Sequence, residues 1–419
     1  MLRRAIFWIA PLSLASEWSL YRDLAQSHFD FHLREAQVAS QNHRHELAAR
    51  HAVRAAAFRR RDGQVRLLAA RLLRRAELPT EAKPHLETAR KRLGDHPEVD
   101  LEQLLNAVQL GQASELVERS LYRRAQRDPN HRCLILEALS VSALSRFRID
   151  QARAWLDEWL SAEVQDPRPH FWRGLALQQM GGYQEDAALA DFRRAVALNP
   201  DYDEARLRLA QLLVKKNAHA EAAGHFQTLL ARQPRNAAAM VGLARCQSAL
   251  GDGEASRGLL EQALGIQPDH VDALRELGIL LLNEGRAEEA LPLLRRANQL
   301  DPSDPYASFN LMQCLQQLGR DEEARRQKAR HEALASRHER TLKLLAELQA
   351  RPKDPDLLSE LGILYLQAGR PDADAAGVWF LQQAIQMAPR HPQAVRTLAE
   401  YFERTGRRDL ASELRHRLK

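Results

Sequence analysis

The chain reads ALADFRRAVALNP at residues 188–200, AAGHFQTLLARQP at 222–234, SRGLLEQALGIQP at 256–268 and ALPLLRRANQLDP at 290–302. The four closing prolines lie 34 residues apart. Each segment opens with alanine or serine and carries phenylalanine or leucine four residues later. Self-similarity at this period indicates repeats built from paired helices.

Each repeat encodes two amphipathic helices. Between residues 203 and 234 one apolar stripe at helical spacing includes Leu209 and Leu213, and a second includes Phe226 and Leu229. Small residues such as Ala290 let the two helices approach closely, and proline ends the second helix. Because 34 residues cannot bury their own apolar faces, neighbouring repeats must stack on one another.

Glycine marks the turn between the two helices of a repeat. Gly251, Gly285 and Gly319 take this place in successive repeats, and Asn217 takes it in the repeat before them. Both residue types tolerate the left-handed backbone that ends many helices. We therefore expect Asn217 to replace glycine in conformation as well as in position.

The repeats resemble those of the tetratricopeptide repeat (TPR) family, of the bacterial multi-repeat type. The residues that carry the resemblance in the clearest repeat are Leu277, Gly278, Gly285, Ala290, Leu294, Ala297 and Pro302. The resemblance implies an all-α fold, a right-handed α-solenoid of stacked helix-turn-helix repeats, here about nine or ten helix pairs. It further implies a non-catalytic scaffold that binds a protein or peptide segment.

Four parts follow from this pattern. Residues 1–17 form a candidate signal or membrane-proximal segment, and residues 18–132 form degenerate, arginine-rich repeats. The TPR array at 133–350, clearest at 169–302, ends in one long helix from Asp321 to Ala350, which contains no glycine or proline. Residues 351–419 hold the last repeats and a polar cap. We expect Leu342, Leu345 and Leu348 to pack the long helix on the next repeat.

The first residues fit two interpretations. Arg3 and Arg4 precede an apolar run that ends near Ala15, which is the order of parts in a short secretory signal over residues 1–15. The run is too short to span a bilayer. Alternatively, Trp8 and Trp18 lie on a lead-in helix that covers the first repeat. The compartment stays open, with a cytoplasmic location slightly favoured over an exported or membrane-attached one.

The net charge of +6 comes from the N-terminal part, where residues 1–150 hold 25 Lys/Arg and 18 Asp/Glu. Five arginines form a candidate patch for an anionic partner: Arg59, Arg60, Arg61, Arg74 and Arg75. This patch supports an alternative function as a nucleic-acid- or membrane-surface-associated protein. Nucleic acid is disfavoured because no stacking aromatics alternate with the arginines. Acidic residues on neighbouring helices could also neutralise them.

The sequence predicts no enzyme, no cofactor and no metal site. His28 and His32 lie four residues apart on one helix face, but no third ligand accompanies them. Ala49 stands where a zinc-protease motif beginning at His45 needs histidine. The three cysteines lack CxxC spacing, and we expect Cys246 and Cys314, two periods apart, to be free thiols.

The family resemblance also places the site. First helices of TPR repeats line the concave surface, which puts seven residues towards a partner-binding groove: Gln211, Arg245, Arg275, Ile279, Tyr306, Phe309 and Gln313. Arg245 and Arg275 are expected to pair with an acidic group of the partner, and Tyr306 and Phe309 to offer an anchor. The family's carboxylate clamp is disfavoured, because Leu207 and Val241 occupy two of its positions. These side chains could also solvate an unused inner face.

Overall fold

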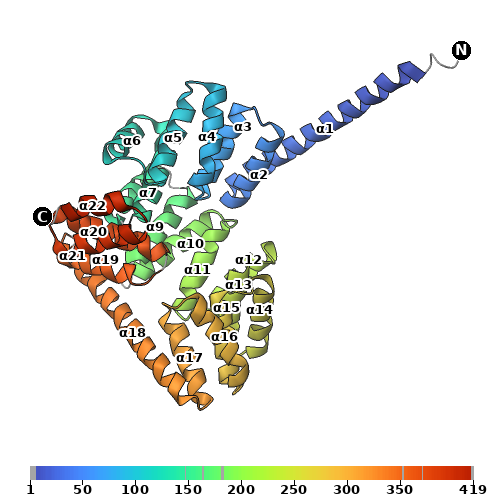
Figure 1. Cartoon of the computed structure of the whole chain (residues 1–419). Helices are drawn as coiled ribbons and strands as arrows, with labels where there is room; N and C mark the ends of the chain where they lie inside the picture. Colours follow the sequence, from blue (N-terminus) through green and yellow to red (C-terminus); the bar gives the residue numbers. More distant parts are fainter. Residues whose placement is uncertain are drawn as a thin grey trace. The chain divides into compact units, whose positions relative to one another are not determined.

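The computed structural model describes residues 6–146, 148–162, 165–180, 184–351, 353–369 and 371–416. Within these ranges the chain forms 22 helices and no strand, so the all-α expectation is confirmed (Figure 1). Eleven helix pairs replace the nine or ten expected. Three of these pairs precede residue 128, in the degenerate part of the sequence.

The helices follow in chain order, with short turns between them. The first helices of the pairs are α1 (Ile6–Gln41), α3 (Gly63–Arg75), α5 (Pro97–Gln109), α7 (Pro129–Ser145), α9 (Pro167–Met180), α11 (Asp203–Lys215), α13 (Ala237–Ala249), α15 (Val271–Asn283), α17 (Pro305–Gln317), α19 (Pro355–Leu366) and α21 (Pro392–Arg404). The second helices are α2 (His45–Phe58), α4 (Pro79–Leu93), α6 (Glu115–Arg127), α8 (Ile149–Ala162), α10 (Glu185–Leu198), α12 (His219–Arg232), α14 (Gly253–Ile266), α16 (Ala287–Leu300), α18 (Asp321–Ala350), α20 (Pro371–Met387) and α22 (Arg408–His416).

Two compact units divide the chain. The N-terminal unit contains Met1–Ala176 together with Arg193–Ala205, and the C-terminal unit contains Leu177–Phe192 together with Arg206–Lys419. The sequence pattern did not predict this division, because the 34-residue period runs through it without a break.

The turns inside the repeats have the predicted backbone. Gly251, Gly285 and Gly319 have φ angles of 91°, 76° and 65°, and Asn217 has φ 59°. Asparagine thus takes the left-handed conformation that glycine takes in the following repeats. Of the helices that follow these turns, α14 begins with a side-chain cap, in which Asp252 Oδ1 accepts a hydrogen bond from the backbone N–H of Ala255 at 3.0 Å. The residues before α12, α16 and α18 form no such cap.

Close helix contacts explain the small residues of the repeat. A Cβ atom added to Gly278 of α15 would lie 2.6 Å from the side chain of Leu294 in α16. One added to Gly242 of α13 would lie 2.2 Å from the ring of Phe226 in α12. Ala290 of α16 is fully buried. The predicted register, with a small residue opposite a bulky one, is therefore present in the structure.

α18 is one uninterrupted helix of 30 residues, as predicted, and Figure 1 shows it running from α17 to α19. The leucine that packs the C-terminal half of α18 against the next repeat is Leu344 and not the expected Leu342. Leu342 is 53% exposed, whereas Leu344 is fully buried in the core of the last repeats. Leu345 and Leu348 pack at the edge of that core, as expected.

α1 is a single helix from Ile6 to Gln41, so it includes residues of the candidate signal segment and of the first degenerate repeat. Of the candidate signal segment, residues 1–5 lie outside the described part of the chain. Among the helices of the described residues, none combines the length and apolarity that crossing a membrane requires.

Candidate partner-binding groove

A cavity of about 580 Å³ opens within the C-terminal unit, between the first helices α15 and α17 and the long helix α18. Residues of α19 and the start of α20 complete its wall. The C-terminal part of α18 supplies six of the lining residues: Leu334, Arg337, His338, Thr341, Leu342 and Leu345. We call this cavity the α18 groove.

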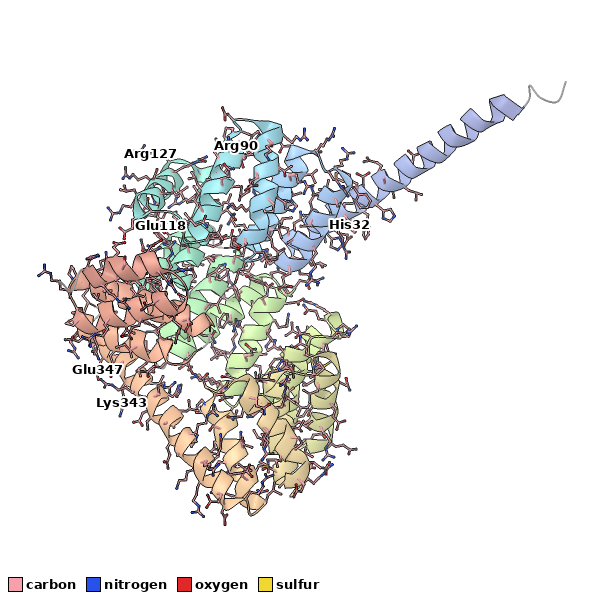
Figure 2. The ribbon with its side chains drawn as sticks, viewed as in Figure 1. His32, Arg90, Glu118, Arg127, Lys343 and Glu347 are labelled. Atoms are coloured by element: carbon pink, nitrogen blue, oxygen red, sulfur yellow. The ribbon has the colours of Figure 1, made fainter. Side chains whose placement is uncertain are left out.

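The opposite face of α18 is solvated and charged. Figure 2 labels Lys343 and Glu347 on the side of the helix away from α17, and both side chains are more than two-fifths exposed. Lys343 pairs with Glu339 one turn away, at 2.7 Å. This face of α18 is therefore solvated, and ion pairs between residues one turn apart lie along it.

The groove exposes two large apolar side chains. Tyr306 of α17 is 66% exposed and Leu342 of α18 is 53% exposed, and both line the same cavity. Leu364 and Tyr365 of α19 lie beside them in the wall. Paired exposed apolar residues inside a concave site, rather than scattered over a surface, are typical of protein-binding surfaces.

An ion-pair network adjoins the groove: Asp272, Arg275 and Asp304 line the cavity, whereas Arg245 and Glu276 belong to the network without lining it. Arg275 Nη1 donates to Asp304 Oδ2 at 2.6 Å, and its Nη2 donates to Asp272 Oδ1 at 2.5 Å. Arg245 Nε donates to Glu276 Oε1 at 2.8 Å. Burial lowers the pKa of Arg275, but the carboxylates of Asp272, Glu276 and Asp304 outweigh that effect and raise it overall. The guanidinium group therefore stays charged and engaged.

This network changes the role expected for the two arginines. From the sequence, Arg245 and Arg275 were expected to meet an acidic group of a partner. In the structure, carboxylates of their own chain already accept their hydrogen bonds. An acidic partner would have to compete with these ion pairs.

The other predicted groove residues are spread more widely. Phe309 is 37% exposed, and its ring lies 5.2 Å from that of His331 on α18. Gln211 and Gln313 are exposed and Ile279 is half-buried, but none of the three lines the α18 groove. Sequence reasoning missed Leu364, Tyr365 and Arg337, because the return of α19 along α18 has no local signature.

A second cavity of about 700 Å³ continues the groove. It shares Asp301, Ser303, Leu334, Arg337 and Ala368 with the first. Arg337 Nη1 donates to the backbone carbonyl of Gln367 at 2.9 Å at this junction. The two cavities together form an elongated recess along α18, a shape that suits an extended or helical segment.

The predicted arginine patch is not a continuous surface. Arg74 is 1% exposed and its Nε donates to Glu102 at 2.9 Å, while Arg75 pairs with Glu137 at 3.3 Å. These two arginines are therefore unavailable to an anionic partner, because α5 and α7 supply acidic residues against them. Arg59 lies over the ring of Phe29 at 4.3 Å, and Arg60 and Arg61 are exposed.

Several polar residues of the N-terminal unit are buried or half-buried. The turn before α11 brings Tyr202 against the loop between α1 and α2, where its ring lies 5.2 Å from that of His43. Burial lowers the pKa of His43 to about 4, and Arg75 adds to the effect. Burial, with Glu77, Glu46 and Asp203 nearby, raises the pKa of Glu204 to about 8.

The histidines of α1 take part in ring contacts. His28 stacks on Phe58 with ring centroids 5.9 Å apart, and Nδ1 of His32 lies 3.1 Å from Nδ1 of His51. Across the part of the chain that the structure describes, no group of three metal-ligating side chains is suited to hold an ion.

Family models match the middle of the chain. One model described as a tetratricopeptide repeat matches residues 173–237, and a second with the same description matches 214–278 and 281–327. The matched ranges include α11 to α17, and therefore most of the first-helix residues predicted for the groove.

Two curated relatives and one solved structure illustrate the likeness. The CTR9 homolog of Arabidopsis thaliana is 31% identical over 152 residues, which is 36% of this chain and 12% of that protein. The protein O-mannosyl-transferase TMTC1 of Homo sapiens is 32% identical over 29% of this chain and 16% of its own length. This chain thus spans less than a fifth of both relatives.

The solved structure is TTC0263, a thermophilic TPR protein of Thermus thermophilus. It is 25% identical to this chain and covers 48% of it, while this chain covers 98% of TTC0263, with a TM-score of 0.36.

Proposed function

Because the chain is a tetratricopeptide repeat protein, we propose that it binds a segment of another protein in the α18 groove and has no catalytic activity of its own. TPR proteins bind peptides or proteins, and the chain has the construction of such a scaffold. The proposal adds the place of binding and a set of contacts.

The pairing of Tyr306 and Leu342 in one cavity carries the proposal. Neither side chain is needed to hold the repeats together, since each remains more than half exposed. Exposed aromatic and aliphatic side chains in a recess gain binding free energy when a partner removes them from water. Tyr306 was predicted from sequence as an anchor of the groove.

The serine and threonine hydroxyl groups that line the cavity are already engaged in hydrogen bonds. Ser303 Oγ donates to Asp301 Oδ1 at 2.7 Å, and Thr341 Oγ1 donates to the backbone carbonyl of Arg337 at 2.9 Å. Neither hydroxyl donates to a histidine, which a nucleophile requires as its base. The transferase name of one relative belongs to a protein of which this chain spans only a small part.

Affinity capture with matched surface variants tests the function. The double change Tyr306→Ser with Leu342→Ser should abolish capture of partners that bind wild type, with unchanged helicity. Leu116→Ser with Leu250→Ser is the control, because these leucines are 73% and 56% exposed elsewhere. Equal capture by the groove variant and by wild type would contradict the proposal.

A further inference from the structure

We propose that the α18 groove selects a segment in which an arginine or lysine lies beside an apolar anchor residue. This inference rests on the groove-binding function and adds the chemistry of the partner. It reverses the charge that the sequence alone suggested for the partner.

Two carboxylates of the network, those of Asp272 and Glu276, each accept hydrogen bonds through only one of their two oxygen atoms. Arg245 Nη2 and Arg275 Nη2 both donate to Oδ1 of Asp272, at 3.2 and 2.5 Å. Arg245 Nε and Arg275 Nη2 both donate to Oε1 of Glu276, at 2.8 and 3.5 Å. In the described part of the chain, no donor lies within hydrogen-bond distance of Oδ2 of Asp272 or Oε2 of Glu276.

Asp272 and Glu276 are four residues apart in α15 and thus lie on one face of the helix, roughly 5–6 Å from each other. Asp272 is 46% exposed at its side chain and lines the cavity. A guanidinium or ammonium group in the cavity can therefore reach Oδ2 of Asp272 without displacing an existing hydrogen bond, with Glu276 adding negative charge beside it. Charge-assisted hydrogen bonds of this kind are the strong ones.

The arginines at or next to the groove already donate hydrogen bonds to acceptors of their own chain. Arg245 and Arg275 are held in ion pairs, and Arg337 donates to the carbonyl of Gln367. An incoming carboxylate would lie close to Asp272 and Asp304, whose like charges repel it. Three carboxylates line the cavity, those of Asp272, Asp301 and Asp304, against the two arginines Arg275 and Arg337; His338 and two tyrosines complete the titratable side chains of the wall. The charge balance favours a cationic partner.

The apolar anchor belongs to the same cavity. Tyr306 and Leu342 are the exposed apolar residues, and Leu345 and Leu364 extend the surface behind them. A basic residue seated at Asp272 thus has apolar wall within the same recess. A segment with leucine or phenylalanine next to arginine or lysine satisfies both features.

A random peptide library displayed on phage provides the probe. It is selected on the full chain and counter-selected on the Tyr306→Ser/Leu342→Ser variant. We expect the enriched peptides to carry arginine or lysine beside a large apolar residue. The affinity of such a peptide should fall at least about tenfold for Asp272→Asn/Glu276→Gln. The matched control Glu254→Gln/Glu261→Gln removes two exposed acidic groups from α14 and should leave the affinity unchanged.

A second measurement leaves the protein unaltered. Replacing the basic residue of an enriched peptide by glutamine should weaken its binding to wild type by a similar factor. Enrichment of acidic peptides, or no loss in either measurement, overturns the inference while the groove function stands. If no peptide distinguishes wild type from the groove variant, the groove function fails, and the inference fails with it.

Discussion

At the scale of single residues, the close approach of the two helices of a repeat depends on glycine at the point of contact. Gly278 lies so close to Leu294 that a Cβ atom cannot fit without movement, whereas Gly258 in α14 has open space around the same position. The two glycines therefore make a matched pair, since both lie inside helices and differ only in what surrounds them.

We expect Gly278→Ala to lower the free energy of unfolding by about 1–3 kcal/mol, because the added methyl group overpacks the contact with Leu294. Gly258→Ala should instead raise it by about 0.5–1 kcal/mol through helix propensity. Urea denaturation followed by circular dichroism measures both. Equal effects of the two changes would show that the α15–α16 contact is not close.

The thiols give a second prediction. Cys246 and Cys314 are buried free thiols, and burial raises the pKa of Cys246 to about 11. Cys133 is only half-buried. In the native protein a thiol reagent should therefore modify Cys133 first, and all three cysteines only after denaturation. A bridge between Cys246 and Cys314 in a non-reducing peptide analysis would refute the stacking of these repeats.

At the scale of elements, α18 joins two roles in one helix. Its N-terminal half closes the repeat begun by α17, and Leu344 in its C-terminal half belongs to the core of the last repeats. One face of α18 thus packs against a hydrophobic core, while adjacent residues of the same helix line the groove.

This division predicts opposite outcomes for two leucines that lie two residues apart. Leu344→Ala should cost about 2–5 kcal/mol, because it leaves a cavity in a fully buried site. Leu342→Ala should stay within roughly 0.5 kcal/mol, as exposed positions usually do. Thermal unfolding of the two variants checks this. A larger loss for Leu342→Ala would mean that the helix is rotated from the position described here.

At the scale of the whole molecule, much of the architecture follows from local sequence. Glycine, asparagine and proline at fixed offsets predicted the turns, and the absence of glycine and proline predicted α18. The pairing of Arg275 with Asp304 was not predicted, because stacking brings together residues of neighbouring repeats. The arginine patch failed for the same reason: Glu102 and Glu137, 28 and 62 residues beyond Arg74 and Arg75, neutralise two of its members.

The interior of the N-terminal unit predicts a pH dependence. The pKa of Glu204 is raised from 4.5 to about 8, so the native state keeps a proton that the unfolded chain releases. Stability should therefore fall as the pH rises through this range, by up to about 1.4 kcal/mol per unit. His43, with its pKa lowered from 6.5 to about 4, acts in the opposite direction only below pH 6.5.

The window between pH 6.5 and 8 thus isolates Glu204. Glu204→Gln should flatten the decline seen for wild type in urea unfolding, and Glu261→Gln, an exposed change, should leave it in place. The same slope in wild type and in Glu204→Gln would exclude a buried, protonated Glu204.

The contact between His43 and Tyr202 also affects when the first helices can complete their packing during translation. A solenoid can acquire structure repeat by repeat as it leaves the ribosome, since most of its contacts are local. The loop after α1, however, meets a partner that lies 159 residues further along the chain, the difference between positions 202 and 43. At usual translation speeds that partner emerges roughly 10–30 s later. Until then the first helices lack the residues that cover them, and this interval is when a nascent chain of this protein most needs a chaperone.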